Sequence, residues 1–210
     1  MSSVTIVRGE EELFARTAHL FATASEITCA ARDLNTWATT RSLPERPVQE
    51  ASPTVRKLYQ PGALMNPATA RHPRTVAAQG AKVRITHDNV NETIIIDRRF
   101  AILAGDLTDG RRSYGVVTEA AVVQNVLSLF DAAWRSATDL TVYDAQHAEL
   151  CSLAPRVMEL LASGCKDETA ARTLDLGVRT YRRRVAELMA ALGADSRFQA
   201  GARAQELGLI

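Results

Sequence analysis

The spacing of hydrophobic and polar residues changes near residue 140. Before it, short β-branched runs alternate with helical stretches, and after it the pattern is almost entirely helical. Strands that alternate with helices are typical of a sheet covered by helices. The pattern therefore predicts two domains: an α/β domain at residues 1–143, with a mixed sheet and covering helices, and an all-α domain of four helices at residues 144–210.

In the first part, alternation and β-branched content predict six strands, and helical periodicity predicts three helices. Residues 40–54 carry three prolines among charges and are predicted to form a loop. The predicted strands are Glu26–Ala31, Val55–Gln60, Ala81–Thr86, Thr93–Ile96, Phe100–Leu103 and Tyr114–Thr118, and the predicted helices are Glu10–Ser25, Pro73–Gln79 and Glu119–Ala137.

The four helices of the second part are predicted at Leu153–Ser163, Asp167–Leu174, Val178–Leu192 and Ser196–Leu207. Asp167 and Ser196 are the expected N-caps of two of them. A short helix, a turn at residues 175–177 that contains a glycine and then a longer helix have the spacing of a helix-turn-helix. The second part is therefore predicted to be an all-α, tetrahelical helix-turn-helix domain.

The helix at residues 178–192 has one apolar stripe and one basic side. The stripe comprises Val178, Tyr181, Val185, Leu188 and Leu192, and it is the face expected to pack on the other helices. The basic residues Arg179, Arg182 and Arg183 lie away from the stripe, and Arg184 lies at its flank.

This helix carries no acidic residue before Glu187. The planar guanidinium suits both phosphate and the major-groove edge of guanine, and a helix enters that groove by its N-terminal side chains. The charge run alone would equally fit a solvated face paired with acids elsewhere. The helix-turn-helix spacing favours DNA binding, because it leaves the charged face exposed.

Residues 150–200 resemble the C-terminal DNA-binding domain of the LuxR family of bacterial regulators. The likeness rests on an ordered set of positions: the end of the first helix at Val157–Gly164, the apolar pair Ala171 and Leu174, then Thr180, Arg182 and Val185, and finally Leu192-Gly193 with Ser196–Ala200.

The LuxR resemblance implies base contacts from Arg182 and Arg183, phosphate contacts from Thr180 and Arg197, and a dimer interface on the last helix. The helical wheel adds Arg179 and Arg184 as phosphate partners. Glu168 stands where the family tends to carry a phosphate-binding lysine, and Lys166 nearby offsets that charge.

The first part resembles the sensor region of actinobacterial regulators that join half of a phospholipase D fold to a LuxR-type C-terminus. The likeness rests on Thr93–Leu103 and on the helix through Leu129-Phe130 and Trp134. Phospholipase D chemistry needs a His, a Lys two residues later and an Asp five beyond that. If Asp97 is that Asp, the other two positions hold Val90 and Glu92, so no enzyme activity is expected.

Composition narrows the remaining possibilities. The chain has a net charge of +1, 46% hydrophobic residues and three widely spaced cysteines without a C-x-x-C pair. This favours reduced thiols in a cytoplasmic protein over a disulfide framework or a zinc site, and no cofactor or metal is expected. No apolar run reaches the roughly 20 residues of a membrane span, and no signal peptide is recognisable at the N-terminus.

The sequence therefore predicts a transcriptional regulator that binds double-stranded DNA as a homodimer, with a non-catalytic sensor or dimerisation domain in front. RNA polymerase and a small-molecule effector are further candidate partners, and a membrane is not. The alternative is a protein-interaction adaptor, or anti-regulator, that has lost DNA binding. Glu168 and the weak net charge favour that alternative, and the arginine face of residues 178–192 opposes it.

Overall fold

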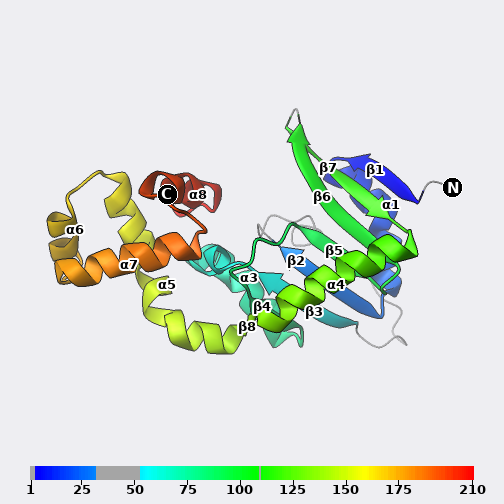
Figure 1. The fold of residues 1–210 in the computed structure, drawn as a ribbon, viewed down its shortest axis with the longest axis horizontal. Coiled ribbons are helices and arrows are strands. Elements are labelled where there is room, and N and C mark those ends of the chain that lie inside the picture. The colour runs from blue at the N-terminus through cyan, green and yellow to red at the C-terminus, as the bar shows by residue number, and fades with distance from the viewer. Residues whose placement is uncertain (1–2, 32–52, 109) are drawn as a thin grey trace.

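The structure is a computed structural model that describes residues 3–31, 53–108 and 110–210. Its centre is an eight-stranded mixed sheet in the order β1-β7-β6-β5-β2-β3-β4-β8 (Figure 1). The strands are β1 (Val4–Arg8), β2 (Glu26–Ala31), β3 (Thr54–Tyr59), β4 (Lys82–Ile85), β5 (Thr93–Ile96), β6 (Phe100–Thr108), β7 (Arg111–Val117) and β8 (Thr138–Asp139).

Within the sheet, β2, β3 and β4 run parallel, and every other neighbouring pair is antiparallel. The strands predicted at residues 93–96 and 100–103 are confirmed and form a hairpin, in which β5 and β6 pair from Ile96 opposite Phe100. Its turn places Asp97 and Arg98 at φ 49° and 56°, and Asp is one of the residue types that best tolerate this left-handed region.

Helices cover both faces of the sheet. Helix α4 (Ala120–Ser136) packs its buried residues Val123, Leu127 and Phe130 on one face, against strand residues that include Leu58 and Ile95. The opposite face is covered by α1 (Glu10–Thr23) and joins a second apolar cluster, which continues without a break into the C-terminal helices. Successive strand residues serve the two clusters in turn, as the two-residue period of a strand requires.

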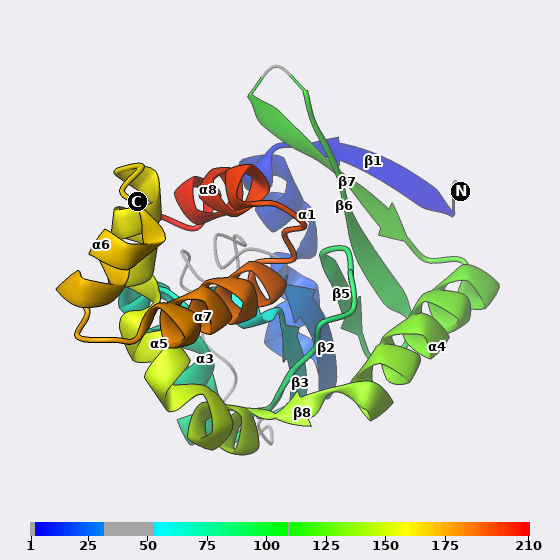
Figure 2. The same ribbon diagram turned by 60° about the vertical axis from the view of Figure 1, so that its left-hand side comes forward.

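The C-terminal helices lie together at one end of the molecule, and the sheet lies at the other (Figures 1 and 2). They are α5 (Leu140–Ala162), α6 (Asp167–Thr173), α7 (Val178–Ala191) and α8 (Arg197–Glu206). They contact the rest of the chain through η1 (Pro61–Leu64), α3 (Pro67–Ala78) and the strands β4 and β8. The Asn66 side chain caps α3 through Ala68 N, and its amide also donates to Leu207 O at 3.1 Å and Gly208 O at 2.8 Å.

Most of the expected elements are confirmed to within a few residues, and three expectations need correction. The helix expected at residues 153–163 begins at Leu140, where Asp139 accepts a hydrogen bond from Thr141 N. The helix expected from Pro73 begins at Pro67, because Asn66 caps it and Pro73 lies within it. The N-cap of α6 is Lys166, so Asp167 is its first helical residue.

Strands β1 and β8 were not expected from the sequence, and most of the proline-rich loop expected at residues 40–54 lies outside the described residues. The proposed boundary at residue 143 falls inside α5, and the division into two domains stays a prediction. Within the described ranges, no helix combines the length and the hydropathy needed to cross a membrane.

Candidate nucleic-acid interface

Helices α6 and α7 are joined by a tight turn at residues 174–177. The backbone amide of Leu176 donates to Ala171 O at 2.8 Å, and Asp175 has φ 55°, so the left-handed residue of the turn is an aspartate. Gly177 is the N-cap of α7 with an ordinary extended backbone and no side-chain cap. The turn holds the N-terminus of α7 next to α6 without a capping side chain.

The apolar stripe expected on α7 is confirmed. Tyr181, Val185 and Leu188 are at most 3% exposed, and Ala170 and Ala171 of α6 are buried against the same cluster. Small side chains on α6 allow its backbone to approach α7 closely. The packing therefore fixes which side of α7 faces outward.

The outward side of α7 carries Arg179, Arg182 and Arg183, all exposed. Among the described residues, Arg179 forms no ion pair, and Arg183 contacts Glu187 at 3.6 Å within its own helix. Lys166 is exposed at the start of α6, and Thr180 is half-buried. Of the residues singled out from the sequence, Lys166, Arg179, Arg182, Arg183 and Arg197 are thus exposed, and Thr180 and Arg184 are half-buried.

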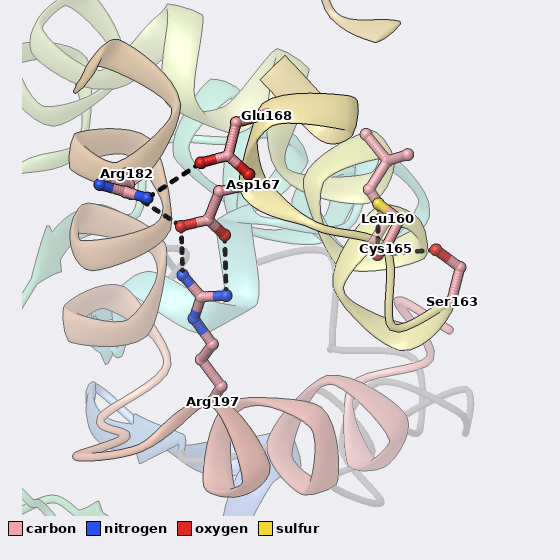
Figure 3. Close-up of polar contacts among 7 residues, drawn as sticks. All are labelled: Leu160, Ser163, Cys165, Asp167, Glu168, Arg182 and Arg197. Carbon is pink, nitrogen blue, oxygen red and sulfur yellow. Dashed lines mark hydrogen bonds and ion pairs between the residues drawn. The ribbon is translucent and has the colours of Figure 1, made fainter. Parts of the chain in front are cut away.

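Asp167 links the arginines of two helices (Figure 3). Its carboxylate accepts from Arg182 Nε at 2.8 Å and from Arg197 Nη1 and Nη2 at 2.9 and 3.2 Å. Glu168 lies 3.4 Å from Arg182 Nη2. Hydrogen bonds from Arg197 and Arg182 lower the pKa of Asp167, so this carboxylate is ionised at neutral pH.

Arg197 reaches this site because Ser196 begins α8 there. Ser196 Oγ accepts from Gln199 N at 3.2 Å, and Gln199 Oε1 accepts from Asp195 N at 2.7 Å. This reciprocal capping satisfies two backbone amides at the helix start. It places Arg197 on the first turn, where it meets Asp167 and lies beside the exposed face of α7.

Arg184 differs from its neighbours. Its side chain is 13% exposed and forms ion pairs with Glu187, at 2.7 Å, and with Glu149 of α5. The hydrogen bond that Arg184 donates to Glu187 is the main reason that the pKa of Arg184 is raised. Arg184 ties α7 to α5 and does not share the outward face.

The sequence did not single out Asp167 as a partner of Arg182 and Arg197. It suggested a cap instead, because an aspartate before a helix commonly serves as one. The signal that remained was an acidic pair, Asp167-Glu168, at the start of the helix that precedes the arginine-rich one. Linking it to Arg197 needed the tertiary structure, since 30 residues separate the two side chains.

The positions that phospholipase D chemistry would use hold side chains engaged in structural contacts. Asp97 Oδ1 accepts from the amides of Ser25 and Glu26, both at 2.8 Å. Glu92 is 8% exposed and forms an ion pair with Arg112.

Among the aromatic residues of the α/β part, Tyr59 and Tyr114 are buried in the core, and Trp134 stacks on Phe130 at a centroid distance of 5.8 Å. Trp37 lies outside the described residues.

The fold is of the kind seen in phospholipase D proteins. The chain superposes on Nuc from Salmonella typhimurium, a phospholipase D family member, with a TM-score of 0.52 and 14% identity, covering 65% of this chain and 97% of that one. This likeness concerns the fold alone. TrmBL2, an archaeal chromatin protein, gives a TM-score of 0.48 at 15% identity over 67% of this chain and 55% of its own.

In sequence, the chain is similar to the Bialaphos biosynthetic pathway regulatory protein of Streptomyces hygroscopicus. The two are 28% identical over 158 residues, which cover 75% of this chain. The chain spans 62% of the length of that relative. No family model matches the chain. The protein is thus a distant homologue of a regulatory protein, with a mixed α/β fold like that of a phospholipase D family member.

Proposed function

We propose that this protein is a transcriptional regulator that binds double-stranded DNA through a helix-turn-helix of the LuxR type, formed by α6 and α7. The observation that carries the proposal is the outward face of α7, on which Arg179, Arg182 and Arg183 are exposed beside Arg197. Four guanidiniums on one surface can neutralise phosphates and reach base edges. The distant likeness to a regulatory protein supports the same assignment.

In this proposal, the N-terminal half of α7 enters the major groove. Arg182 and Arg183 contact base edges, and Arg179, Thr180, Arg197 and Lys166 contact phosphates. Arg184 supports α7 from behind through Glu149 and Glu187. One short helix reads few base pairs, so the protein binds as a homodimer on two half-sites about one helical turn apart. Helix α8, with Phe198 87% exposed, is the proposed contact between copies.

The α/β part acts as a sensor or dimerisation module without catalysis. Asp97 is engaged by two backbone amides and Glu92 by Arg112, and no His–Lys pair stands at the spacing that phosphoryl transfer requires. A direct check is hydrolysis of a phosphodiester substrate. We expect no turnover above that of a heat-denatured sample.

Fluorescence anisotropy of a labelled promoter duplex and of a random duplex, at several salt concentrations, tests the DNA-binding proposal. Arg182→Ala and Arg183→Ala should each weaken promoter binding by about 1–3 kcal/mol. Arg156→Ala is the matched control: Arg156 is equally exposed but lies on α5, where it contacts Glu159 at 3.9 Å, and should leave binding unchanged.

A second candidate is a protein-interaction adaptor that has lost DNA binding. The observation in its favour is the pair of carboxylates at the start of α6, which occupies Arg182 and Arg197 in the free protein. The two functions differ in their salt dependence, because each neutralised phosphate releases counterions. Equal, negligible affinity for both duplexes, unchanged by the arginine substitutions, would replace the regulator proposal with the adaptor.

A further inference from the structure

A cleft of about 290 Å³ lies between α5, α7 and the loop that follows β4. Its wall on α7 comes from Glu187 and Ala190, at the opposite end of that helix from Arg179. A second hollow of about 240 Å³ adjoins it and shares the lining residues His87, Ala190 and Ala191. Figure 2 shows α7 lying beside the segment between β4 and β5. The size approaches that of small-molecule sites, roughly 300 Å³ and above.

One side of the cleft is a wall of aromatic rings. Tyr143 and His147 of α5 stack with centroids 4.0 Å apart and an interplanar angle of 13°. His87 approaches Tyr143 from the loop at 6.4 Å. His147 Nδ1 lies 3.1 Å from Tyr143 O, which fixes the orientation of its ring. Leu150 and Ala191 add apolar surface.

The charged groups of the cleft favour a cation. Arg184, whose side chain is 13% exposed, forms ion pairs with both Glu149 and Glu187. The side chains of Glu149 and Glu187 are 61% and 37% exposed. Of the charged side chains that line the cleft, two are thus carboxylates and one is a guanidinium. Arg183 contacts Glu187 at 3.6 Å but is 63% exposed and does not line the cleft, so the lining itself has an excess of one negative charge. In the adjoining hollow, the positive charge of Arg203 is compensated by Glu206, whose carboxylate lies 3.7 Å away. Aromatic faces also attract cations, because the negative side of their quadrupole points outward.

We propose that this cleft is a binding site for a small planar organic cation, such as a protonated aromatic amine. The ring of the ligand would lie against His87 and His147, because Tyr143 is only 2% exposed although it lines the cleft. The charged nitrogen of the ligand would face Glu149 and Glu187. Such a ligand contacts both α7 and the loop after β4, and therefore stabilises the docked arrangement of the two parts of the chain. The site goes beyond the proposed DNA binding and does not depend on it.

Two fluorescent probes of the same ring size test the charge preference in the full chain without DNA. 9-Aminoacridine is a planar cation at neutral pH, and 9-anthracenecarboxylate is a planar anion. We expect the cation to bind saturably and to raise the unfolding temperature, and the anion to bind at least roughly tenfold more weakly. Equal affinity for the two probes, or no binding of the cation to folded protein, would overturn the proposal.

Conservative variants locate the binding. Glu187→Gln and Glu149→Gln should each weaken binding of the cation by roughly three- to tenfold. Each variant removes one of the two negative charges, and the remaining carboxylate is still paired with Arg184. Glu159→Gln is the control, since Glu159 lies on α5 outside the cleft and, within the described part of the chain, forms an ion pair with Arg156 alone. Circular dichroism checks that the variants are folded.

A cation affinity that is the same in all three glutamine variants would place the probe elsewhere and refute the site. Arg182→Ala separates this inference from the proposed function. That substitution should lower DNA affinity and leave cation binding unchanged, because Arg182 does not line the cleft. A wild-type chain that binds the cation but not DNA would show that the DNA-binding proposal has failed, and one that binds DNA but not the cation would show that the cleft proposal has failed.

Discussion

Asp167→Asn is the substitution that best tests how the C-terminal helices are held together. The asparagine keeps the shape of the side chain and one acceptor oxygen, but removes the charge that Arg182 and Arg197 share. Asp167 is 15% exposed, and the two arginines are 59% and 50% exposed. The interaction thus joins a largely buried anion to two solvated cations.

The expected loss in unfolding free energy follows from those exposures. Exposed ion pairs contribute about 0.2–1 kcal/mol each, and the partly buried, two-pronged contact of Arg197 belongs at the upper end of that range. An anion in the first turn of α6 adds a few tenths of a kcal/mol. Together these predict a loss of about 1–2 kcal/mol for Asp167→Asn, or roughly 0.5–1 M in the urea midpoint at an m-value near 2 kcal/mol/M.

The effect should depend on pH in one direction. Because the two arginines lower the pKa of Asp167 in the folded state, its contribution is fully present above the ordinary pKa of an aspartate. It is lost as the pH falls through the lowered folded-state pKa, where the wild-type side chain also becomes neutral. The difference between wild type and variant should therefore be full at pH 7 and shrink steadily in acid.

Urea unfolding followed by circular dichroism at a series of pH values measures this difference. Glu168→Gln is the control, because Glu168 is 64% exposed and makes one contact at 3.4 Å, so its loss should be below about 0.5 kcal/mol. A wild-type-like urea midpoint for Asp167→Asn at pH 7 would show that the Asp167 charge does not stabilise the fold. A difference in unfolding free energy between wild type and variant that grows in acid would contradict the lowered pKa of Asp167.

Three further substitutions test the packing, each read from urea unfolding. Leu127→Ala should lower the unfolding free energy by about 2–5 kcal/mol, because Leu127 of α4 is fully buried. Leu129 of the same helix is 73% exposed, so Leu129→Ala should change it by no more than about 0.5 kcal/mol, and similar losses in the two variants would contradict the placement of α4. Asn66→Ala should cost about 1–3 kcal/mol, since it removes the cap of α3 and two hydrogen bonds to the end of α8, and a neutral result would mean that this joint does not form. Arg56→Met should lower the unfolding free energy by about 1–3 kcal/mol, because Arg56 lies over the Phe130 ring at 5.3 Å and forms an ion pair with Asp131 at 2.8 Å. An unchanged urea midpoint would exclude a stabilising role for these two contacts.

The sequence by itself determined the local elements and the orientation of α7. The buried stripe through Tyr181, Val185 and Leu188 is written in a 3.6-residue period, and the pairing of β5 with β6 follows from two apolar runs around a turn. These features depend on neighbours along the chain, so they can be predicted without knowing the fold. The exposed arginines Arg179, Arg182 and Arg183 follow from the same periodicity.

Which of the arginines predicted to bind DNA form ion pairs within the protein became clear only from the tertiary structure. Arg197 meets Asp167 across 30 positions and Arg184 meets Glu149 across 35. No local period carries information about such pairs, and the same charge run is compatible with a free surface or a neutralised one. The order of the strands, with β1 beside β7, was hidden for the same reason, because hydrogen-bond pairing between distant strands leaves no trace in spacing.

The cleft between α5 and α7 likewise exists only in three dimensions. His87, Tyr143 and Glu187 are isolated residues in the sequence, each more simply explained as a surface or core side chain. They line one cleft because the C-terminal helices pack against the α/β part, where Asn66 donates hydrogen bonds to the carbonyls that follow α8. Chain periodicity determined what each helix buries, and long-range packing determined which charges and rings face one another.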